Sequence, residues 1–293
     1  SFRLFAGRNR EFPGKIAFGI ELMQDAVFKT DISGDFVLCR ALSARYKKEG
    51  GGGMEHFERK GIGEALFGLP YPGRGILLGM GENGRDLFLS YFIMGRSENS
   101  RNRVFREEGE ELRIDPACPE RLSDPSLVLY SPLRSVSGRL IVANGDQSDT
   151  IHDFLEAGKS FEEALFTRSF EPDRPNDTPR ISGIMDLLGR NYTLSILKAE
   201  SPGSGNCARY FYHYAFEPGL GHLIHTYQGR GGPLPSFQGE PRPVLIRERT
   251  AEELAGLIWR SLDPENRISL YVRRIDRKSG ETGNALINRF LCT

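Results

Sequence analysis

The sequence predicts an α+β fold in which antiparallel sheets are layered with a few helices. Most apolar runs after residue 70 are too short for long helices, and residues typical of turns separate them. Only a few segments repeat apolar residues with helical spacing, and they lie between the predicted strands. Strands in hairpins with intervening helices are typical of layered α+β domains, and no internal repeat suggests otherwise.

Two apolar runs, GILLGM (75–80) and RDLFLSYFIM (85–94), are predicted strands of one hairpin, because the Asn83-Gly84 pair between them is a turn signal. The same stretch contains the G-x-G-x-x-G pattern of dinucleotide-binding loops, beginning at Gly79. That motif needs a helix directly after the glycines, and here a strand is predicted. We therefore interpret the pattern as a hairpin.

A short helix is predicted before this hairpin over FERKGIGEALF (57–67), ended by the following glycine and proline. A longer helical region spans SDTIHDFLEAGKSFEEALFTRSF (148–170), with Ser148 or Asp149 as its N-cap and an interruption at Gly158.

A third helix is predicted over TAEELAGLIWRSLD (250–263), where Thr250 is the expected N-cap and Glu253 occupies the capping-box position. The other apolar runs predict strands within residues 126–145, 178–200, 208–217, 221–229 and 267–276.

The composition indicates a globular protein without a global charge. The chain has 293 residues, of which 39% are hydrophobic, and its 39 lysines and arginines balance 39 aspartates and glutamates. No apolar stretch approaches the roughly 18 residues of a membrane span, and the first residues lack the apolar core of a signal peptide. We therefore expect a cytoplasmic protein that binds neither nucleic acid nor membrane, and any anion binding must be local.

Neither a disulfide framework nor a metal site is predicted. His222 and His225 lie three residues apart, and such residues on a strand point to opposite faces and cannot hold one metal ion together. The cysteines are scattered, lack any CxxC pair and are expected to be buried thiols: Cys39, Cys118, Cys207 and Cys292.

A glycine run at residues 50–53 divides the sequence. Residues 1–53 show little periodicity and are expected to be an extra N-terminal segment, whereas residues 54–293 are expected to form one domain. The run is typical of a flexible linker. Alternatively, Lys-Glu-Gly-Gly can be written by a purine-rich string that resembles a bacterial ribosome-binding site just before Met54, so that residues 1–53 would be translated upstream sequence.

Polar residues gather where predicted strands end, in GRSENSRNR (95–103), ANGDQSDT (143–150) and FEPDRPNDTPRISG (170–183). Loops held by strand ends are where a scaffold positions functional groups. Arginine grips phosphate oxygens bidentately, while asparagine and serine satisfy ester and sugar oxygens. A phosphorylated small molecule is therefore expected, and a solvated salt-bridging loop is the alternative. The arginines that suggest the phosphate are Arg96, Arg101, Arg103 and Arg180.

Several longer motifs occur in one order between about Met54 and the C-terminus: YPGRGILLG, FIMGRSENSRNRVF, NGDQSDTI, PNDTPRISG and PLPSFQGEP. In these motifs the chain resembles the bacterial branch of the IMP cyclohydrolase family, whose archaeal members make IMP in the last step of purine synthesis. Residues 1–53 have no counterpart in that resemblance, which favours the interpretation as upstream sequence.

The resemblance implies a four-layer αββα sandwich, similar to N-terminal nucleophile hydrolases but without a terminal nucleophile. It also implies the ring closure of FAICAR, the 5-formamidoimidazole-4-carboxamide ribotide, to IMP with loss of water. The reacting groups sit on the same imidazole ring, so much of the proximity is built into the substrate. The enzyme must select the reactive rotamer, stabilise charge on the formyl oxygen and move protons, which requires no cofactor.

The resemblance places three catalytic residues. Arg103 ends the Ser-Arg-Asn-Arg motif and is expected to hold a carbonyl or phosphate. Tyr130 precedes the SPLR segment and is expected to donate to the formyl oxygen, and Glu171 precedes the TPRI motif and is expected to accept the amide proton. Without a ligand role, Tyr130 would be a core residue at a strand end and Glu171 a solvated turn carboxylate.

Further residues are expected to contact the substrate. Asp177 stands where the archaeal pattern has asparagine, so no ligand contact is assigned to its side chain. The substrate-binding candidates are Arg96, Ser97, Arg101, Asn102, Asn144, Asp149, Asn176 and Arg180.

Two rival functions stay open at this point. One is another amide-bond hydrolase of the same fold, which would need a nucleophile activated by a nearby base. The other is a non-catalytic module that binds purine ribotides. The oligomeric state is not determined by the sequence, so a homo-oligomer is possible.

Overall fold

A computed structural model of the chain describes residues 59–121, 129–229 and 231–290. The expected extra segment, residues 1–53, lies outside the described residues, as does the boundary at Met54. Within the described ranges the strands form two sheets, and nearly all of their pairings are antiparallel. The predicted α+β class with antiparallel sheets is therefore confirmed.

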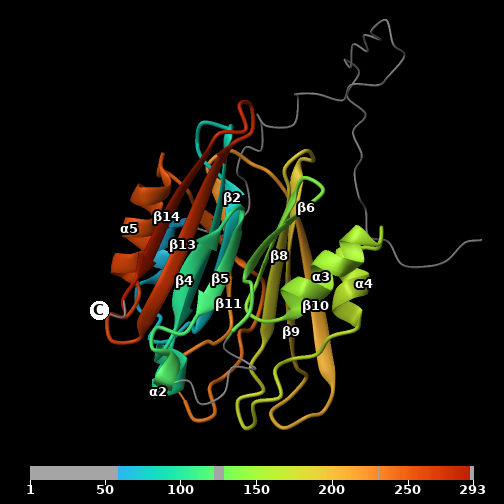
Figure 1. Cartoon of the computed structure of the whole chain (residues 1–293), viewed down its shortest axis with the longest axis vertical. Helices are drawn as coiled ribbons and strands as arrows, with labels where there is room; N and C mark the ends of the chain where they lie inside the picture. Colours follow the sequence, from blue (N-terminus) through green and yellow to red (C-terminus); the bar gives the residue numbers. More distant parts are fainter. Residues whose placement is uncertain (1–58, 122–128, 230, 291–293) are drawn as a thin grey trace, which may run out of the picture. The chain divides into compact units, whose positions relative to one another are not determined.

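The second sheet is one continuous meander of the chain, inserted between strands of the first (Figure 1). In spatial order, the first sheet contains β1 (Lys60–Gly61), β12 (Arg242–Leu245), β11 (Leu220–His225), β2 (Arg74–Met80), β3 (Asp86–Met94), β13 (Arg267–Asp276) and β14 (Thr282–Asn288). The second contains β10 (Cys207–Ala215), β9 (Asn191–Ala199), β8 (Arg180–Asp186), β7 (Arg139–Ala143), β6 (Leu133–Val136), β5 (Glu111–Asp115) and β4 (Val104–Glu108).

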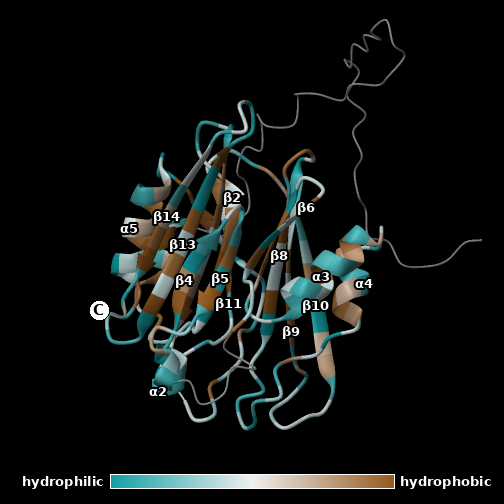
Figure 2. Cartoon of the chain, in the orientation of Figure 1, coloured by the Kyte–Doolittle hydropathy of each residue, from teal (hydrophilic) through white to brown (hydrophobic). Residues whose placement is uncertain are grey.

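Helices pack on the outer face of each sheet (Figure 1). α1 (Ile62–Leu66) and α5 (Ala251–Ser261) bury apolar side chains against the first sheet. α3 (Gln147–Glu156) and α4 (Phe161–Phe166) do the same against the second. The largest apolar cluster takes residues from both sheets and fills the space between them. Figure 2 shows the apolar residues concentrated on the strands.

Strand β3 is buried on both faces, which explains why nearly all of its residues are apolar. Successive side chains of a strand point to opposite faces, and β3 lies in the middle of its sheet with apolar material on both sides. Leu89 and Tyr91 therefore join the cluster between the sheets, while Phe88 and Phe92 join the cluster under the helices. The hairpin of β2 and β3 is confirmed, and the dinucleotide-binding interpretation of its glycines is excluded by the strand that follows them.

Several local predictions hold and others need correction. Thr250 caps α5 by accepting a hydrogen bond from the backbone N–H of Glu253, as predicted. The helix expected over 57–67 begins only at Ile62, because Lys60 and Gly61 pair with β12. The N-cap of α3 is Asp146, so the prediction of Ser148 or Asp149 is wrong.

The hairpin of β4 and β5 was not predicted from the sequence. Four glutamates in VFREEGEELRID obscure the alternation of apolar residues, yet Phe105 and Ile114 still point into the core between the sheets. The expectation of buried thiols is also wrong for Cys118 and Cys207, which are half-buried. Cys39 and Cys292 lie outside the described residues.

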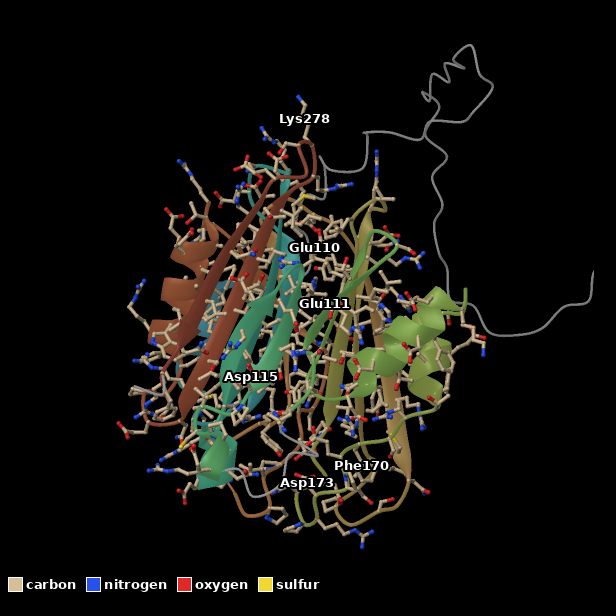
Figure 3. All side chains as sticks on the ribbon, viewed as in Figure 1. Glu110, Glu111, Asp115, Phe170, Asp173 and Lys278 are labelled. Carbon is tan, nitrogen blue, oxygen red and sulfur yellow. The ribbon has the colours of Figure 1, made fainter. Side chains whose placement is uncertain are left out.

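The antiparallel register gathers particular strand ends at one end of the two sheets. Arg74 at the start of β2 pairs with Ile93 at the end of β3, and Arg180 at the start of β8 pairs with Leu197 near the end of β9. The one-turn helix α2 (Glu98–Arg101), which follows β3, lies at the same end as Asp173, whereas Lys278 lies at the opposite end (Figure 3).

Candidate active site

A polar cavity of about 410 Å³ opens at the α2 end of the sheets. Its walls come from the start of β2, the loop and helix after β3, the loop before β8 and the segment after β11. The lining residues are Tyr71, Arg74, Met94, Arg96, Ser97, Asn99, Ser100, Arg103, Glu171, Asp173, Asn176, Thr178, Tyr227 and Leu234. Two of the three predicted catalytic residues, Arg103 and Glu171, are among them.

The cavity contains a buried ion pair between Arg74 and Glu171. Nη2 of Arg74 lies 3.3 Å from Oε2 of Glu171, and only 13% and 3% of the two side chains are exposed. Burial raises the pKa of Glu171 above its ordinary value, although the nearby charge of Arg74 opposes that rise. Burial therefore makes the carboxylate of Glu171 more basic than a solvated one.

Arg103 is a second buried cation beside this pair, with 2% of the residue exposed. Its Nε donates to the carbonyl of Ser100 at 2.8 Å, and Nη2 donates to the carbonyl of Met94 at 3.3 Å. Burial and the charge of Arg74 lower the pKa of Arg103. Nη1 of Arg103 and Nε of Arg74 are buried without a hydrogen-bond partner in the described part of the chain. Such donors are costly unless a ligand satisfies them.

Tyr130 belongs to the same electrostatic cluster but does not line this cavity. Its hydroxyl lies 2.7 Å from the hydroxyl of Tyr91, and both are buried. Burial raises the pKa of Tyr130, while the charges of Arg74 and Arg103 oppose that rise. Tyr130 lines a separate cavity of about 400 Å³. Its predicted contact with a substrate therefore stays a prediction.

A chain of hydroxyl groups forms part of the cavity wall. Tyr227 and Thr178 are joined through their hydroxyl groups, and Thr178 also bonds through Oγ1 to the carboxylate of Asp173. The backbone N–H of Thr178 donates to the other carboxylate oxygen at 2.7 Å. Burial raises the pKa of Tyr227 to about 12, so its hydroxyl is protonated at neutral pH.

The rim of the cavity carries three of the predicted substrate-binding residues. The guanidinium of Arg96 lies 4.7 Å from the ring centre of Tyr71 and is exposed. Ser97 caps α2 by accepting from the N–H of Ser100 at 3.2 Å, and Asn176 accepts from the N–H of Leu234 at 3.4 Å. All three line the cavity, and their contact with a ligand stays a prediction.

Five other predicted residues do not line it. Asn144 accepts from the N–H of Ile181 and donates to the carbonyl of Pro179, and Asn102 exchanges two hydrogen bonds with the backbone of Cys118. These two asparagines therefore hold loops in place. The other three are Arg101, which donates to the carbonyl of Gly95, Asp149, which pairs with Arg134, and Arg180, which pairs with Asp146.

Several residues of the cavity wall were not predicted from the sequence, above all Arg74, Thr178 and Tyr227. Arg74 stands inside YPGRGILLG and Thr178 inside PNDTPRISG, two motifs that carried the family resemblance, so this signal was available. Tyr227 follows an apolar run and is typical of a core residue. Only its partners reveal its position in the wall.

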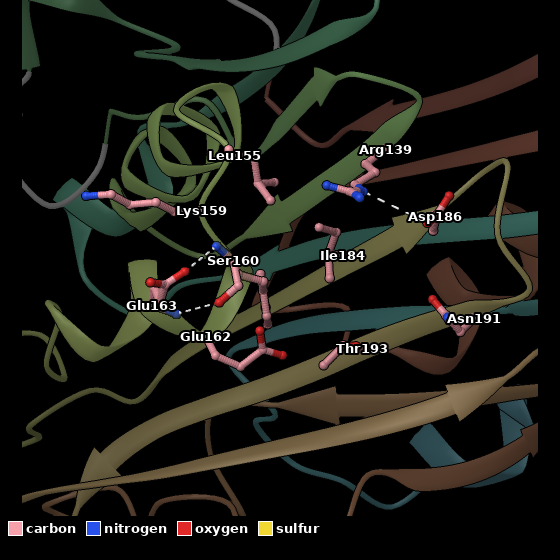
Figure 4. Close-up of a pocket in the computed structure, with 12 residues that line it drawn as sticks. Arg139, Leu155, Lys159, Ser160, Glu162, Glu163, Ile184, Asp186, Asn191 and Thr193 are labelled. Carbon is pink, nitrogen blue, oxygen red and sulfur yellow. Dashed lines mark hydrogen bonds and ion pairs between the residues drawn. The ribbon is translucent and has the colours of Figure 1, made fainter.

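A third cavity, of about 580 Å³, lies between α3, α4 and the outer face of the second sheet (Figure 4). Its charged groups are of both signs, and Arg139 pairs with Asp186. Ser160 and Glu163 form the capping box of α4, in which the side chain of each accepts from the backbone N–H of the other. None of the buried unsatisfied side-chain atoms found in the described residues belongs to its lining. The cavity at the α2 end, with the unpaired donors of Arg74 and Arg103, is therefore the better site for an anion.

The two histidines of β11 have different partners. His222 contacts the hydroxyl of Tyr192, whereas His225 contacts the backbone carbonyl of Tyr227. No helix in the described ranges is long and apolar enough to cross a membrane.

The fold and the site together define an α+β protein with a polar cavity in which two buried arginines lie beside a buried carboxylate. Residues 71–280 match the model of a protein family that is described as "IMP cyclohydrolase-like protein". Because this match covers most of the chain, the chain belongs to the IMP cyclohydrolase-like family.

Curated relatives carry a matching name. The chain is 32% identical over 185 residues to the IMP cyclohydrolase of Methanopyrus kandleri. The aligned region covers 62% of this chain and 85% of that protein. It is 29% identical over 116 residues to the IMP cyclohydrolase of Halobacterium salinarum, and this alignment covers 38% of this chain and 58% of that protein. The resemblance noted from the motifs is therefore confirmed at the level of the family.

Proposed function

We propose that the chain is an IMP cyclohydrolase that closes FAICAR to IMP with loss of water, the last step of de novo purine synthesis. The observation that carries this proposal is the buried cluster of Arg74, Arg103 and Glu171 in a cavity built from the family motifs. Two cations and one carboxylate leave a net positive site, which suits an anionic ribotide. The names of the curated relatives support the same reaction.

The roles follow from what each group can do at its position. Glu171, made more basic by burial, accepts a proton from the carboxamide nitrogen as that nitrogen attacks the formyl carbon. The free donor of Arg103 stabilises negative charge on a substrate oxygen. Tyr130, whose hydroxyl lies among the same charged groups, donates to the formyl oxygen.

Substrate binding is assigned to the rim and to the loops behind it. Arg96, Ser97 and Asn176 are proposed to contact the phosphate and ribose directly, because they line the cavity. The residues behind the rim bond within the protein and are proposed to contribute to substrate binding from there: Arg101, Asn102, Asn144, Asp149 and Arg180.

We also propose that the layers form a four-layer αββα sandwich of the N-terminal nucleophile hydrolase type. The helices on the two outer faces and the apolar cluster between the sheets support this assignment. The domain is proposed to span residues 54–293 and to act in the cytoplasm on a small purine ribotide, with no cofactor; a homo-oligomer is compatible with this proposal.

The direct test is an absorbance assay of the purified full chain with FAICAR, with IMP identified as the product by chromatography. Formation of IMP at a rate proportional to enzyme concentration supports the proposal. Cleavage of an amide without ring closure would favour the rival amide-bond hydrolase. Tight binding of IMP with no turnover would favour the non-catalytic ribotide-binding module.

A further inference from the structure

The hydroxyl chain from Tyr227 through Thr178 to Asp173 has a definite direction. An ionised carboxylate only accepts hydrogen bonds, and the hydroxyl of Thr178 has a single proton. Since Thr178 bonds to Asp173, its proton points to the carboxylate, and Tyr227 must donate its own proton to Thr178. The oxygen of Tyr227 therefore has lone pairs left for a donor in the cavity.

All three members of the chain line the same cavity as Glu171 and Arg103. Tyr227 is buried, while Asp173 is half-buried at the outer end. The chain thus runs from the interior of the site towards its solvent-facing edge, which is the arrangement needed to carry a proton out.

Ring closure needs a route for a second proton, besides the one that Glu171 accepts. The reaction removes one hydrogen from the carboxamide nitrogen and one from the formamide nitrogen, and both end in the water that is lost. Glu171 accounts for the first transfer, because the proton that it accepts from the carboxamide nitrogen passes to the formyl oxygen and becomes the hydrogen of the leaving hydroxide, which returns Glu171 to its ionised form. No role proposed above for Arg103 or Tyr130 removes the second hydrogen.

We propose, on the basis of the proposed function, that the Tyr227–Thr178–Asp173 chain is the proton relay for this second transfer. As the C–O bond of the cyclic intermediate breaks and hydroxide leaves, the formamide N–H proton moves to the Tyr227 oxygen. The proton of Tyr227 moves to Thr178, and the proton of Thr178 moves to Asp173. The electron pair of the broken N–H bond forms the C=N bond of the new ring.

Charge and atoms balance in this step. Asp173 then releases its proton to solvent, where it combines with the hydroxide as the water product. Rotation of the two hydroxyl groups restores the starting directions. The step needs no oxidant, reductant or additional reactant.

The experiment uses the full chain with FAICAR and measures kcat, KM, the affinity for IMP and the dependence of kcat on the deuterium content of the solvent. Thr178→Val and Tyr227→Phe each remove one hydroxyl from the relay. Thr178→Ser keeps it. Matched controls are Thr193→Val and Tyr192→Phe, whose hydroxyl groups bond to His213 and His222, in the half of β9 away from the cavity.

We expect Thr178→Val and Tyr227→Phe to lower kcat by about 10²-fold or more, the usual effect of a positioned acid–base group, with little change in IMP affinity. The double variant should be no slower than the slower single variant, because either change breaks the same relay. Thr178→Ser should restore most of kcat. The solvent-deuterium dependence should change in both relay variants and in neither control.

Near-normal kcat in both relay variants, or losses confined to KM and IMP affinity, would overturn the relay and leave the proposed function standing. Failure of the unmodified chain to form IMP would overturn both. Thermal unfolding of each variant shows whether it is folded, and if Thr178→Val is not, Tyr227→Phe decides the question, because its ring and backbone contacts are retained.

Discussion

Arg74 and Glu171 lie 97 residues apart in the sequence, yet they form an ion pair that almost no water reaches. A buried pair of this kind is strongly disrupted when one partner is removed, because the other charge is left uncompensated. The pair therefore controls both the position and the basicity of the proposed catalytic carboxylate.

The first prediction concerns pH. Glu171 must be ionised to accept a proton, and burial raises its pKa, so kcat should fall with decreasing pH at a higher pH than for a solvated glutamate, whose pKa is about 4.3. Arg74→Met removes the charge that opposes this rise, so the acidic limb should move to still higher pH. The measurement is the pH dependence of kcat. Glu171→Gln should lose most activity together with that limb, and persistence of the limb in that variant would assign it to another group.

The second prediction concerns Tyr130. Tyr130→Phe removes one hydroxyl and should lower kcat by about 10²–10³-fold, the usual effect of removing one oxyanion donor, with little change in KM. Tyr271→Phe is the matched control, because Tyr271 is a buried tyrosine whose hydroxyl bonds to Glu107 and Arg273 instead. Normal turnover of Tyr130→Phe at saturating FAICAR would reduce Tyr130 to a packing residue.

The third prediction concerns the arginines after β3. Arg96→Ala and Arg103→Ala should weaken IMP binding, measured by calorimetry, whereas Arg106→Ala should not, because Arg106 is exposed on β4 and pairs with Asp115. Arg103→Lys should be a poor substitute, since the guanidinium holds two carbonyls and still offers a donor. Equal losses in all three alanine variants would indicate a diffuse basic surface.

The fourth prediction concerns the glycine run at residues 50–53. A shortened protein beginning at Met54 should unfold cooperatively at the same temperature as the full chain and should keep its kcat, because the family match begins only at residue 71. Thermal unfolding followed by calorimetry and the FAICAR assay check this. Loss of cooperative unfolding would make residues 1–53 part of the fold.

Much of the fold could be predicted because its signals are local. The apolar run of β3, the turn at Asn83-Gly84 and the cap at Thr250 each depend on neighbours a few residues away. The hairpin of β4 and β5 escaped because its exposed faces are charged and its apolar positions are few.

For the site, the sequence by itself determined which loops are unusual and which family they resemble. It so named Arg103 and Glu171, which the structure brings into one cavity, and Tyr130, which lines another. It could not show that Asn102 and Asn144 turn to the backbone, or that Arg74 and Tyr227 complete the wall. Only the tertiary structure decided these points. The partner of a polar side chain depends on which strand ends become neighbours when the sheets form, and the residues so joined are far apart along the chain.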